Sequence, residues 1–319
     1  MSVFVKHAAT SCAFTSSDSW VILSPIEQSI KRKIESIGTP LKDWGIQINY
    51  GIKTGCNEAF IIDEAKRAEI LSWCHDANER KRTEQIIRPI LRGRDIKRYA
   101  YEWAHLYIIA TFPAFHLDIE DYPAVKKHLL YFGKERLEQT GREHIVNGAR
   151  VKARKKSNNK WFETQDTIGY WDDFNKPKIV WADLARTGNA FIYDEAGFTA
   201  PNTTYLIASD DTSMLKYLIG LLNSKAMLQY LDWVSAKLDE TGWRWFKQYV
   251  ELFPIPSTST DAVRIINLVN KVLMLKQANP SADTSSVERE IDLIVYRLYG
   301  LTAEEASAID NRKLYESVK

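Results

Sequence analysis

At residues 51–63 the chain reads Gly51-Ile52-Lys53-Thr54-Gly55-Cys56-Asn57-Glu58-Ala59-Phe60-Ile61-Ile62-Asp63, with two glycines four residues apart and then an apolar run. That run, from Ala59 to Ile62, predicts a buried strand. The alternation of apolar and polar residues from Trp44 to Tyr50 predicts a second strand with one buried face. We therefore expect Gly51 to Asn57 to form a turn between two strands, with glycines where the backbone needs a positive φ or a close approach.

This turn would present Lys53, Thr54 and Asn57 at the end of a sheet. One positive charge and two short hydrogen-bonding side chains on a rigid turn can hold a phosphate or a base edge. An ordinary hairpin with solvated polar tips explains the same residues, and a short motif taken alone favours that alternative. The turn by itself leaves both interpretations open.

The composition is that of a globular protein and names no partner. The chain has 319 residues, of which 45% are hydrophobic and 26% charged, and its net charge is only +2. Cys12, Cys56 and Cys74 form no CxxC pair and leave an odd thiol in any disulfide scheme, which favours a reducing, cytoplasmic setting. The start is not signal-like and no apolar run approaches about 18 residues, so we expect neither secretion nor a membrane span.

The order of patterns predicts a mixed α/β (α+β) fold with a twisted, largely antiparallel sheet. We expect a first domain over residues 1–256, of which 1–19 form an irregular entry, and a C-terminal helical hairpin over 257–319. Ser24-Pro25-Ile26-Glu27 is typical of a helix start, with an N-cap, a proline and a reciprocal glutamate. Further helices are predicted at 64–74, 122–137 and 212–231, and strands at 106–111, 178–181, 190–193 and 204–208.

The C-terminal residues carry two capping boxes, Ser285 with Glu288 and Thr302 with Glu305. On both hairpin helices, apolar residues cover more of the helix surface than the one face that would pack against the other helix. Part of this surface must therefore meet the rest of the chain, which is the commoner outcome, or a separate catalytic domain or subunit.

No catalytic motif is visible. Ser213-Met214-Leu215-Lys216 and Lys53-Thr54-Gly55 match the SxxK and KTG elements of penicillin-recognising enzymes, but in reversed order. Three acid-x-Lys triplets occur, and none follows a strand with its own acid, as a metal-dependent nuclease would require. The six histidines form no zinc motif, and no dinucleotide or Walker loop is present. We therefore expect no catalytic residue, metal ligand or cofactor site in this chain.

Basic residues concentrate in two stretches, Arg80 to Arg98 and Arg142 to Lys160, and the second stretch is predicted to be a long loop. Solvated faces account for many such runs. Here, however, asparagine and tryptophan are interleaved with residues that neutralise phosphates and bond to base edges. We expect phosphate contacts chiefly from Lys152, Arg154, Lys155 and Lys156, and base contacts from Lys53, Asn57, Asn158 and Asn159. The full predicted DNA-contact set is Lys53, Thr54, Asn57, Arg92, Arg94, Arg98, Arg150, Lys152, Arg154, Lys155, Lys156, Asn158, Asn159, Lys160, Trp161, Arg186, Trp243 and Arg244.

Several motifs, in a fixed order along roughly residues 20–310, resemble the TaqI-like C-terminal specificity domain. They begin with the segment 51–63 and Ile90-Leu91-Arg92-Gly93-Arg94-Asp95-Ile96-Lys97-Arg98-Tyr99. The others are Lys176 to Val180, Leu218 to Ser224, Glu251 to Pro256 and Ile291 to Thr302. The resemblance implies the target-recognition part of a single-chain restriction–modification enzyme or related DNA adenine methyltransferase.

The sequence and the resemblance together predict sequence-specific binding of duplex DNA. The resemblance implies that methyl transfer, with or without DNA cleavage, resides in a methyltransferase or nuclease domain or subunit outside this chain. S-adenosylmethionine and Mg²⁺ would act there. One alternative is a protein-interaction module of a phage-defence assembly whose basic loops are merely solvated. A degenerate enzyme is a third possibility, and it would need a metal or cofactor response.

Overall fold

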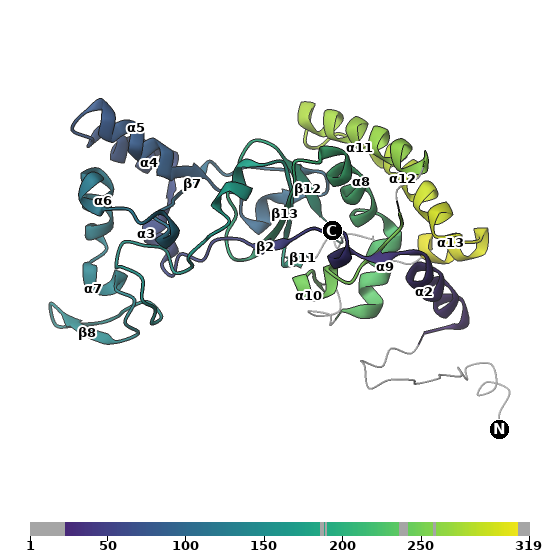
Figure 1. The fold of residues 1–319 in the computed structure, drawn as a ribbon, viewed down its shortest axis with the longest axis horizontal. Helices are drawn as coiled ribbons and strands as arrows, with labels where there is room; N and C mark the ends of the chain where they lie inside the picture. Colours follow the sequence, from purple (N-terminus) through teal and green to yellow (C-terminus); the bar gives the residue numbers. More distant parts are fainter. Residues whose placement is uncertain (1–22, 186–187, 189, 236–241, 258–259, 312–319) are drawn as a thin grey trace, which may run out of the picture.

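A four-stranded sheet lies at the middle of an elongated molecule (Figure 1). The computed structural model describes residues 23–185, 188, 190–235, 242–257 and 260–311. In sheet order the strands are β12 (Phe191–Asp194), β10 (Lys178–Ala182), β13 (Thr204–Ala208) and β2 (Ile48–Tyr50), and each neighbouring pair is antiparallel. Side chains of β10 alternate between two cores: Ile179 and Trp181 join one, and Val180 joins the other.

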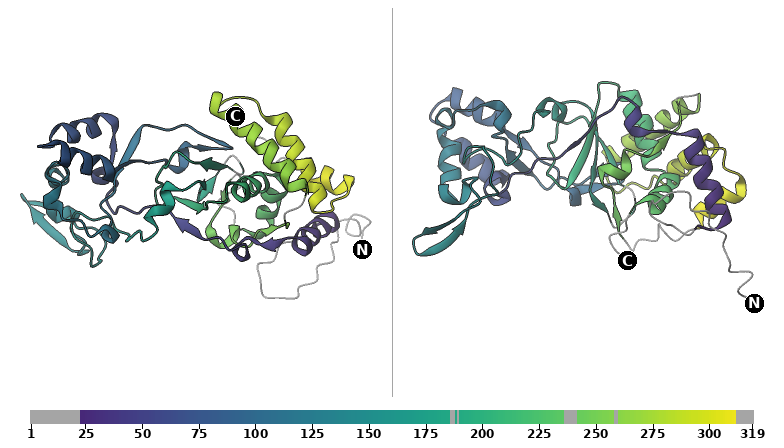
Figure 2. Two further views of the ribbon diagram at one scale, coloured as in Figure 1. Left: turned by 45° about the horizontal axis from the view of Figure 1, so that its top comes forward. Right: turned by 60° about the horizontal axis from the view of Figure 1, so that its bottom comes forward.

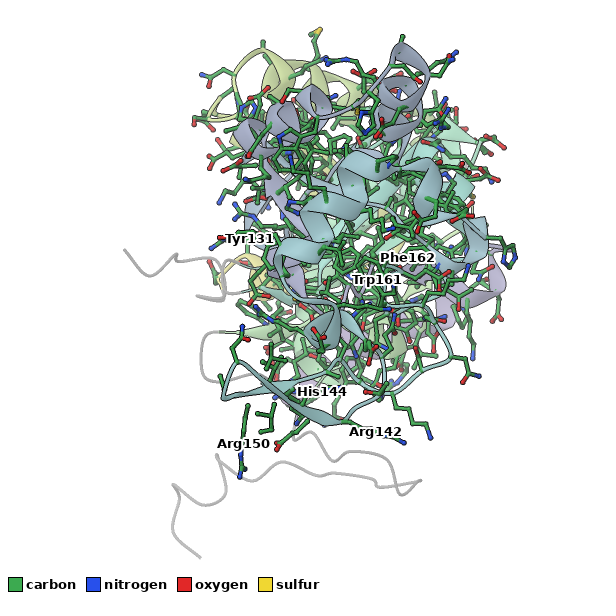
Figure 3. The ribbon with its side chains drawn as sticks, turned by 90° about the vertical axis from the view of Figure 1, so that its left-hand side faces the viewer. Tyr131, Arg142, His144, Arg150, Trp161 and Phe162 are labelled. Carbon is green, nitrogen blue, oxygen red and sulfur yellow. The ribbon has the colours of Figure 1, made fainter. Side chains whose placement is uncertain are left out.

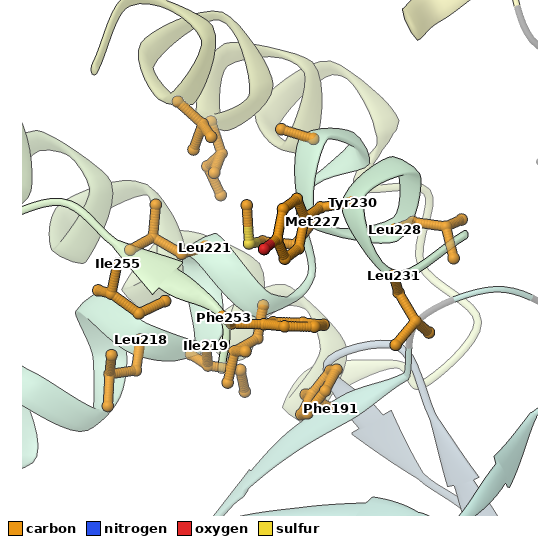
Figure 4. Packing of buried hydrophobic residues seen from close by; sticks show 14 of the residues in the cluster. Phe191, Leu218, Ile219, Leu221, Met227, Leu228, Tyr230, Leu231, Phe253 and Ile255 are labelled. Atoms are coloured by element: carbon orange, nitrogen blue, oxygen red, sulfur yellow. The ribbon is translucent and has the colours of Figure 1, made fainter. Parts of the chain in front are cut away.

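Helices cover one face of this sheet and form the larger lobe (Figures 1 and 2). Phe191 of the sheet packs there with Leu218, Met227 and Phe253 (Figure 4). The helices are α2 (Pro25–Ile37), α8 (Thr212–Leu222), α9 (Lys225–Val234), α10 (Lys247–Val250), α11 (Thr260–Ala278), α12 (Ser285–Leu298) and α13 (Ala303–Asp310).

The C-terminal hairpin of α11 and α12 packs on α8 and α9 of the same chain. A Cβ at Gly220 of α8 would lie 2.5 Å from Cγ2 of Ile265 and 3.0 Å from Cγ2 of Val269, so α8 and α11 approach closely because a glycine stands between them. The domain boundary predicted at residue 256 stays a prediction, since the helices on both sides of it share one buried cluster.

A smaller lobe, which we call the distal lobe (residues 53–89 and 106–168), lies at the other end of the molecule (Figure 1). Its sheet has the order β3 (Ile61–Asp63), β7 (Leu106–Ile109), β4 (Ile87–Pro89), with antiparallel pairs. The surrounding helices are α3 (Asn57–Phe60), α4 (Glu64–Ser72), α5 (Ala77–Ile86), α6 (Pro123–Tyr131) and α7 (Lys134–Leu137).

Short elements complete the fold. Two-stranded sheets join β1 (Thr39–Pro40) to β15 (Pro254–Ile255), β5 (Ile96–Lys97) to β6 (Ala100–Tyr101), β11 (Leu184–Ala185) to β14 (Trp243–Arg244), and β8 (Glu143–Val146) to β9 (Ala149–Lys152). In the part of the chain that the structure describes, 3₁₀ turns lie at Leu41–Asp43, Gly93–Asp95, Pro113–Phe115, Ile119–Asp121 and Trp171–Asn175. No helix of the described residues is long and apolar enough to cross a membrane.

The structure confirms the α+β class, the antiparallel sheets and the capping boxes at Ser24 and Thr302. The box predicted at Ser285 is wrong, because Thr284 is the N-cap residue of α12. The single helix predicted over 212–231 is two helices, because Asn223 turns its side chain to the backbone of Phe191 and Ser224 caps α9. The helix predicted over 122–137 breaks at Gly133, where φ is +83°.

The turn predicted between two strands is instead a crossing between two sheets. The strand β2 belongs to the central sheet, β3 belongs to the distal lobe, and the residues expected to start the second strand form α3. Gly51 lies where this crossing begins and donates from its N–H to the carbonyl oxygen of Thr204 at 2.9 Å. A Cβ on Gly51 would lie 1.8 Å from the carbonyl oxygen of Pro201, which the chain cannot accommodate without moving backbone.

Replacing Gly51 with alanine is expected to lower the free energy of unfolding by about 2–3 kcal/mol, because the clash is with backbone rather than with a flexible side chain. Urea unfolding of the full chain measures this. Gly169→Ala is the matched control, because a Cβ there would meet nothing within 4 Å. The close approach would not constrain the fold if both variants unfolded at the wild-type midpoint.

Candidate nucleic-acid interface

The Gly51–Asn57 segment forms a bridge between the lobes, and its backbone is held on both sides. The N–H of Ile52 donates to the carbonyl oxygen of Ala200, and the carbonyl oxygen of Lys53 accepts from the N–H groups of Gln165 and Asp166. The side chains of Lys53 and Asn57 are exposed, as the sequence predicted. The rigid turn therefore offers one cation and one amide to solvent.

Thr54 is not available to DNA, which corrects the sequence prediction. Only 1% of its surface is exposed. Its Oγ1 donates to Oδ1 of Asn57 at 2.6 Å and accepts from the N–H of Cys56 at 3.2 Å. The hydroxyl satisfies polar groups at the start of α3, as serine and threonine commonly do beside helix ends.

The second basic stretch, predicted as a long loop, contains a β-hairpin that projects from the distal lobe (Figures 1 and 2). Its strands β8 and β9 pair from Glu143 with Lys152 to Val146 with Ala149. The turn between them is Asn147-Gly148, with φ of +50° and +80°, and two positive φ values are what a two-residue type I′ turn needs. The loop prediction is therefore wrong for residues 143–152, although the Asn-Gly pair signalled a hairpin.

Arg154 is a second correction, because it is buried and structural. Only 5% of its surface is exposed. Its guanidinium donates to the carbonyl oxygens of Leu137, Thr54 and Trp161 at 2.7–2.8 Å. Burial lowers the pKa of Arg154 to about 10, so the group stays charged at neutral pH. This side chain ties α7, the turn after the hairpin and the Gly51–Asn57 segment together and cannot also hold a phosphate.

The other basic side chains of this stretch point to solvent. Figure 3 shows Arg142, His144 and Arg150 on the hairpin, below Trp161 and Phe162. A shallow depression of about 390 Å³ lies beside the hairpin, with Asn158 and Trp161 in its lining. Asn159 reaches the same depression, but its amide nitrogen donates to the carbonyl oxygens of Thr164 and Gln165. The exposed predicted residues here are Arg150, Lys152, Lys155, Lys156, Asn158 and Lys160, with Asn159 and Trp161 half-buried.

The first basic stretch is largely paired within the protein. Arg92 makes two hydrogen bonds from its guanidinium to the carboxylate of Asp95, at 2.7 and 2.9 Å. Arg98 is ion-paired with Glu288 of α12, in the helical lobe. Both arginines therefore hold parts of the fold together while staying partly exposed, and their contact with DNA stays a prediction. Arg94 remains exposed.

Trp243, Arg244 and Arg186 complete the predicted DNA-contact set. Trp243 is buried and donates from Nε1 to Asp232, which excludes it from a surface contact. Arg244 is half-buried over the ring of Phe246. Arg186 lies outside the described residues, as do residues 1–19.

Some surface residues of the distal lobe were not predicted from the sequence as candidate contact residues. Tyr131 of α6 and Ile145 of β8 are among the most exposed large side chains. Lys134 of α7 lines the depression beside the hairpin. Whether a residue lies at the outer end of a lobe depends on tertiary structure, which local sequence patterns do not show. The Asn147-Gly148 pair is the one local signal that could have placed Ile145 on a hairpin.

Among the described residues, no group of three or more His, Cys, Asp or Glu side chains could hold a metal ion. The exposed side chains of this surface offer positive charge and hydrogen-bonding groups. Several cations, two amides and a half-exposed indole suit a polyanion whose bases present hydrogen-bonding edges.

Comparison with known proteins gives a consistent result. The family model described as the TaqI-like C-terminal specificity domain matches residues 88–255. A curated relative, the type II methyltransferase M.PaeR7I of Pseudomonas aeruginosa, is 25% identical over 294 residues, which are 91% of this chain and 44% of that protein.

Two solved structures share the fold. The type IIL restriction-modification enzyme MmeI, in complex with DNA, aligns with a TM-score of 0.54 and 14% identity, over 84% of this chain and 36% of that one. The type IIG restriction endonuclease BpuSI aligns with a TM-score of 0.50 and 12% identity, over 89% and 34%. The chain therefore spans less than half the length of each protein it matches here.

Proposed function

Because this chain belongs to the TaqI-like C-terminal specificity domain family, we propose that it binds a specific sequence of duplex DNA as the target-recognition part of a restriction–modification system. The observation that carries this proposal is the charge of the hairpin region. Residues 141–156 expose Arg142, Arg150, Lys152, Lys155 and Lys156 against the single acid Glu143. A protruding, cationic hairpin beside a rigid polar turn suits a phosphate backbone and the groove next to it.

We assign the chemistry of such a system to parts outside this chain. The protein matched in sequence is a methyltransferase more than twice as long as the aligned region. Methyl transfer with S-adenosylmethionine, and Mg²⁺-dependent cleavage where it occurs, would belong to a methyltransferase or nuclease domain or subunit. We also propose a cytoplasmic setting, which the free thiols of Cys56 and Cys74 support.

Selection of duplexes from a random pool by the full chain tests the proposal. We expect a short enriched motif. The variant Arg150→Glu/Lys155→Glu/Lys156→Glu should enrich nothing, because it reverses three exposed charges on the proposed contact surface. The matched control Arg264→Glu/Lys271→Glu places charge reversals on α11 and should select the wild-type motif. If the wild-type protein enriched no motif, or if both variants lost binding alike, the basic end of the distal lobe would not be the recognition surface.

Lys155 is expected to act on phosphates alone. Replacing it with alanine should weaken cognate and random duplexes by the same factor and lower the slope of log affinity against log salt by about 0.9. Titrations at four salt concentrations measure the slope, with Lys271→Ala as the control. A loss confined to the cognate duplex would instead assign Lys155 to a base.

A further inference from the structure

The outward face of the β8–β9 hairpin combines a large aliphatic side chain with cations. Paired residues of an antiparallel ribbon lie on the same face, so Ile145 and Arg150 stand beside one another, with Glu143 and Lys152 next along the ribbon. The surface of Ile145 is 70% exposed, and the side chain of Arg150 is 81% exposed. The Ile145 side chain, exposed on a projecting strand, is therefore accessible to a binding partner.

The opposite face of the hairpin fixes this orientation. His144, Val146 and Val151 are half-buried there, and His144 lies 3.8 Å from the carboxylate of Glu138 at the end of α7. The base of the ribbon is held by backbone hydrogen bonds from Ala153 to Arg142 and from Arg154 to Glu138. Because side chains alternate along a strand, the ribbon cannot turn Ile145 inward without turning its inner face outward.

We propose that this ribbon enters the major groove of the target duplex and that Ile145 contacts the C5-methyl group of a thymine there. This inference rests on the proposed function and names the base contact that the ribbon makes. The major groove, about 12 Å wide, admits a two-stranded ribbon, whereas the minor groove is only about 6 Å wide. Among the base edges of unmodified DNA, the thymine methyl is the apolar group that an aliphatic side chain can cover.

The neighbouring charges favour DNA over a protein partner. Arg150 lies directly across the ribbon from Ile145, and Lys152 is the next residue on the same face. Both lie within a region that exposes five basic side chains against one acid. The same face also carries Glu143, whose carboxylate lies 3.9 Å from the Arg150 guanidinium. An apolar side chain on a surface with a net positive charge is complementary to a groove, whose walls are phosphates and whose floor holds bases. Arg150 would bond to a phosphate or to a guanine edge beside the contacted thymine.

Replacing thymine by uracil in the selected duplex tests the contact, because uracil keeps the base pair and removes only the methyl group. At one thymine position, wild-type protein should bind the uracil duplex about fourfold more weakly, the factor expected for one buried methyl-sized group. The Ile145→Ser variant should bind both duplexes equally. Val263→Ser, an exposed change on α11, should keep the wild-type preference. Thermal unfolding of all three proteins checks that the fold is intact.

The outcomes separate this inference from the proposed function. If wild-type protein and Ile145→Ser discriminate thymine from uracil equally at every position, Ile145 does not read the methyl group, although specific binding stands. The ribbon assignment also fails if Ile145→Ser selects the wild-type motif unchanged. If wild-type protein enriches no duplex at all, the proposed function itself has failed.

Discussion

Raising the salt concentration from 50 to 200 mM is expected to weaken binding of the selected duplex on the order of a thousandfold. The reason is counterion release. Each phosphate neutralised by a lysine or arginine contributes about 0.9 to the slope of log affinity against log salt, so six contacts give about this change. The exposed cations that can supply them are Lys53, Arg142, Arg150, Lys152, Lys155, Lys156 and Lys160.

Fluorescence anisotropy with a labelled duplex measures this dependence at four or more salt concentrations. The Arg150→Glu/Lys155→Glu/Lys156→Glu variant serves as the comparison. Because it lacks three phosphate contacts, its slope of log affinity against log salt should be shallower by roughly 2.7. An affinity that stayed constant from 50 to 200 mM salt would mean that phosphates contribute nothing, and the electrostatic part of the proposal would be lost.

Replacing Arg154 with methionine is expected to lower the free energy of unfolding by about 3 kcal/mol or more. The guanidinium donates to three carbonyl oxygens, and a buried polar group left without its partner costs about 1–3 kcal/mol. Because these carbonyls belong to Leu137, Thr54 and Trp161, the loss should also loosen the hairpin's base against the Gly51–Asn57 segment. Denaturant unfolding gives the stability, and hydrogen exchange of residues 137–161 reports the local loosening.

Arg150→Met is the matched control for Arg154→Met. Arg150 is exposed, so its loss should change stability by no more than about 0.5 kcal/mol while weakening DNA binding. The two arginines should thus separate stability from binding. Should Arg154→Met prove as stable as wild type and bind DNA more weakly, the buried hydrogen bonds would be misassigned and the sequence-based phosphate role restored.

The comparison of Arg154 with Lys155 shows what the sequence could not give. Both residues lie in one basic run, and composition treats them alike. Arg154 is buried and Lys155 is exposed because the Arg154 guanidinium donates to carbonyl oxygens of Thr54, Leu137 and Trp161. These residues lie up to 100 positions away along the chain. Long-range hydrogen bonding of this kind leaves no periodicity for local patterns to reveal.

Local signals were reliable where the chain's own neighbours decide the structure. The capping box at Ser24 and the strand at Lys178 depend on adjacent residues, and both were predicted correctly. The segment 44–63 was predicted as a strand over 44–50, a turn over 51–57 and a strand over 59–62. Its second strand is shorter than expected because α3 takes up Asn57 to Phe60, and its two strands join different sheets. The apolar run from Ala59 to Ile62 indicated that these residues are buried, but it did not indicate in which hydrophobic core they pack.

The central claim is that the chain distinguishes one DNA sequence from others. It is tested most directly by the ratio of two dissociation constants, one for the selected duplex and one for a scrambled duplex of the same composition, measured at the same salt concentration. Specific recognition predicts a ratio of about a thousand or more. A ratio near one would show that the exposed cations of the distal lobe bind DNA without reading it, and would contradict the assignment of a specificity function.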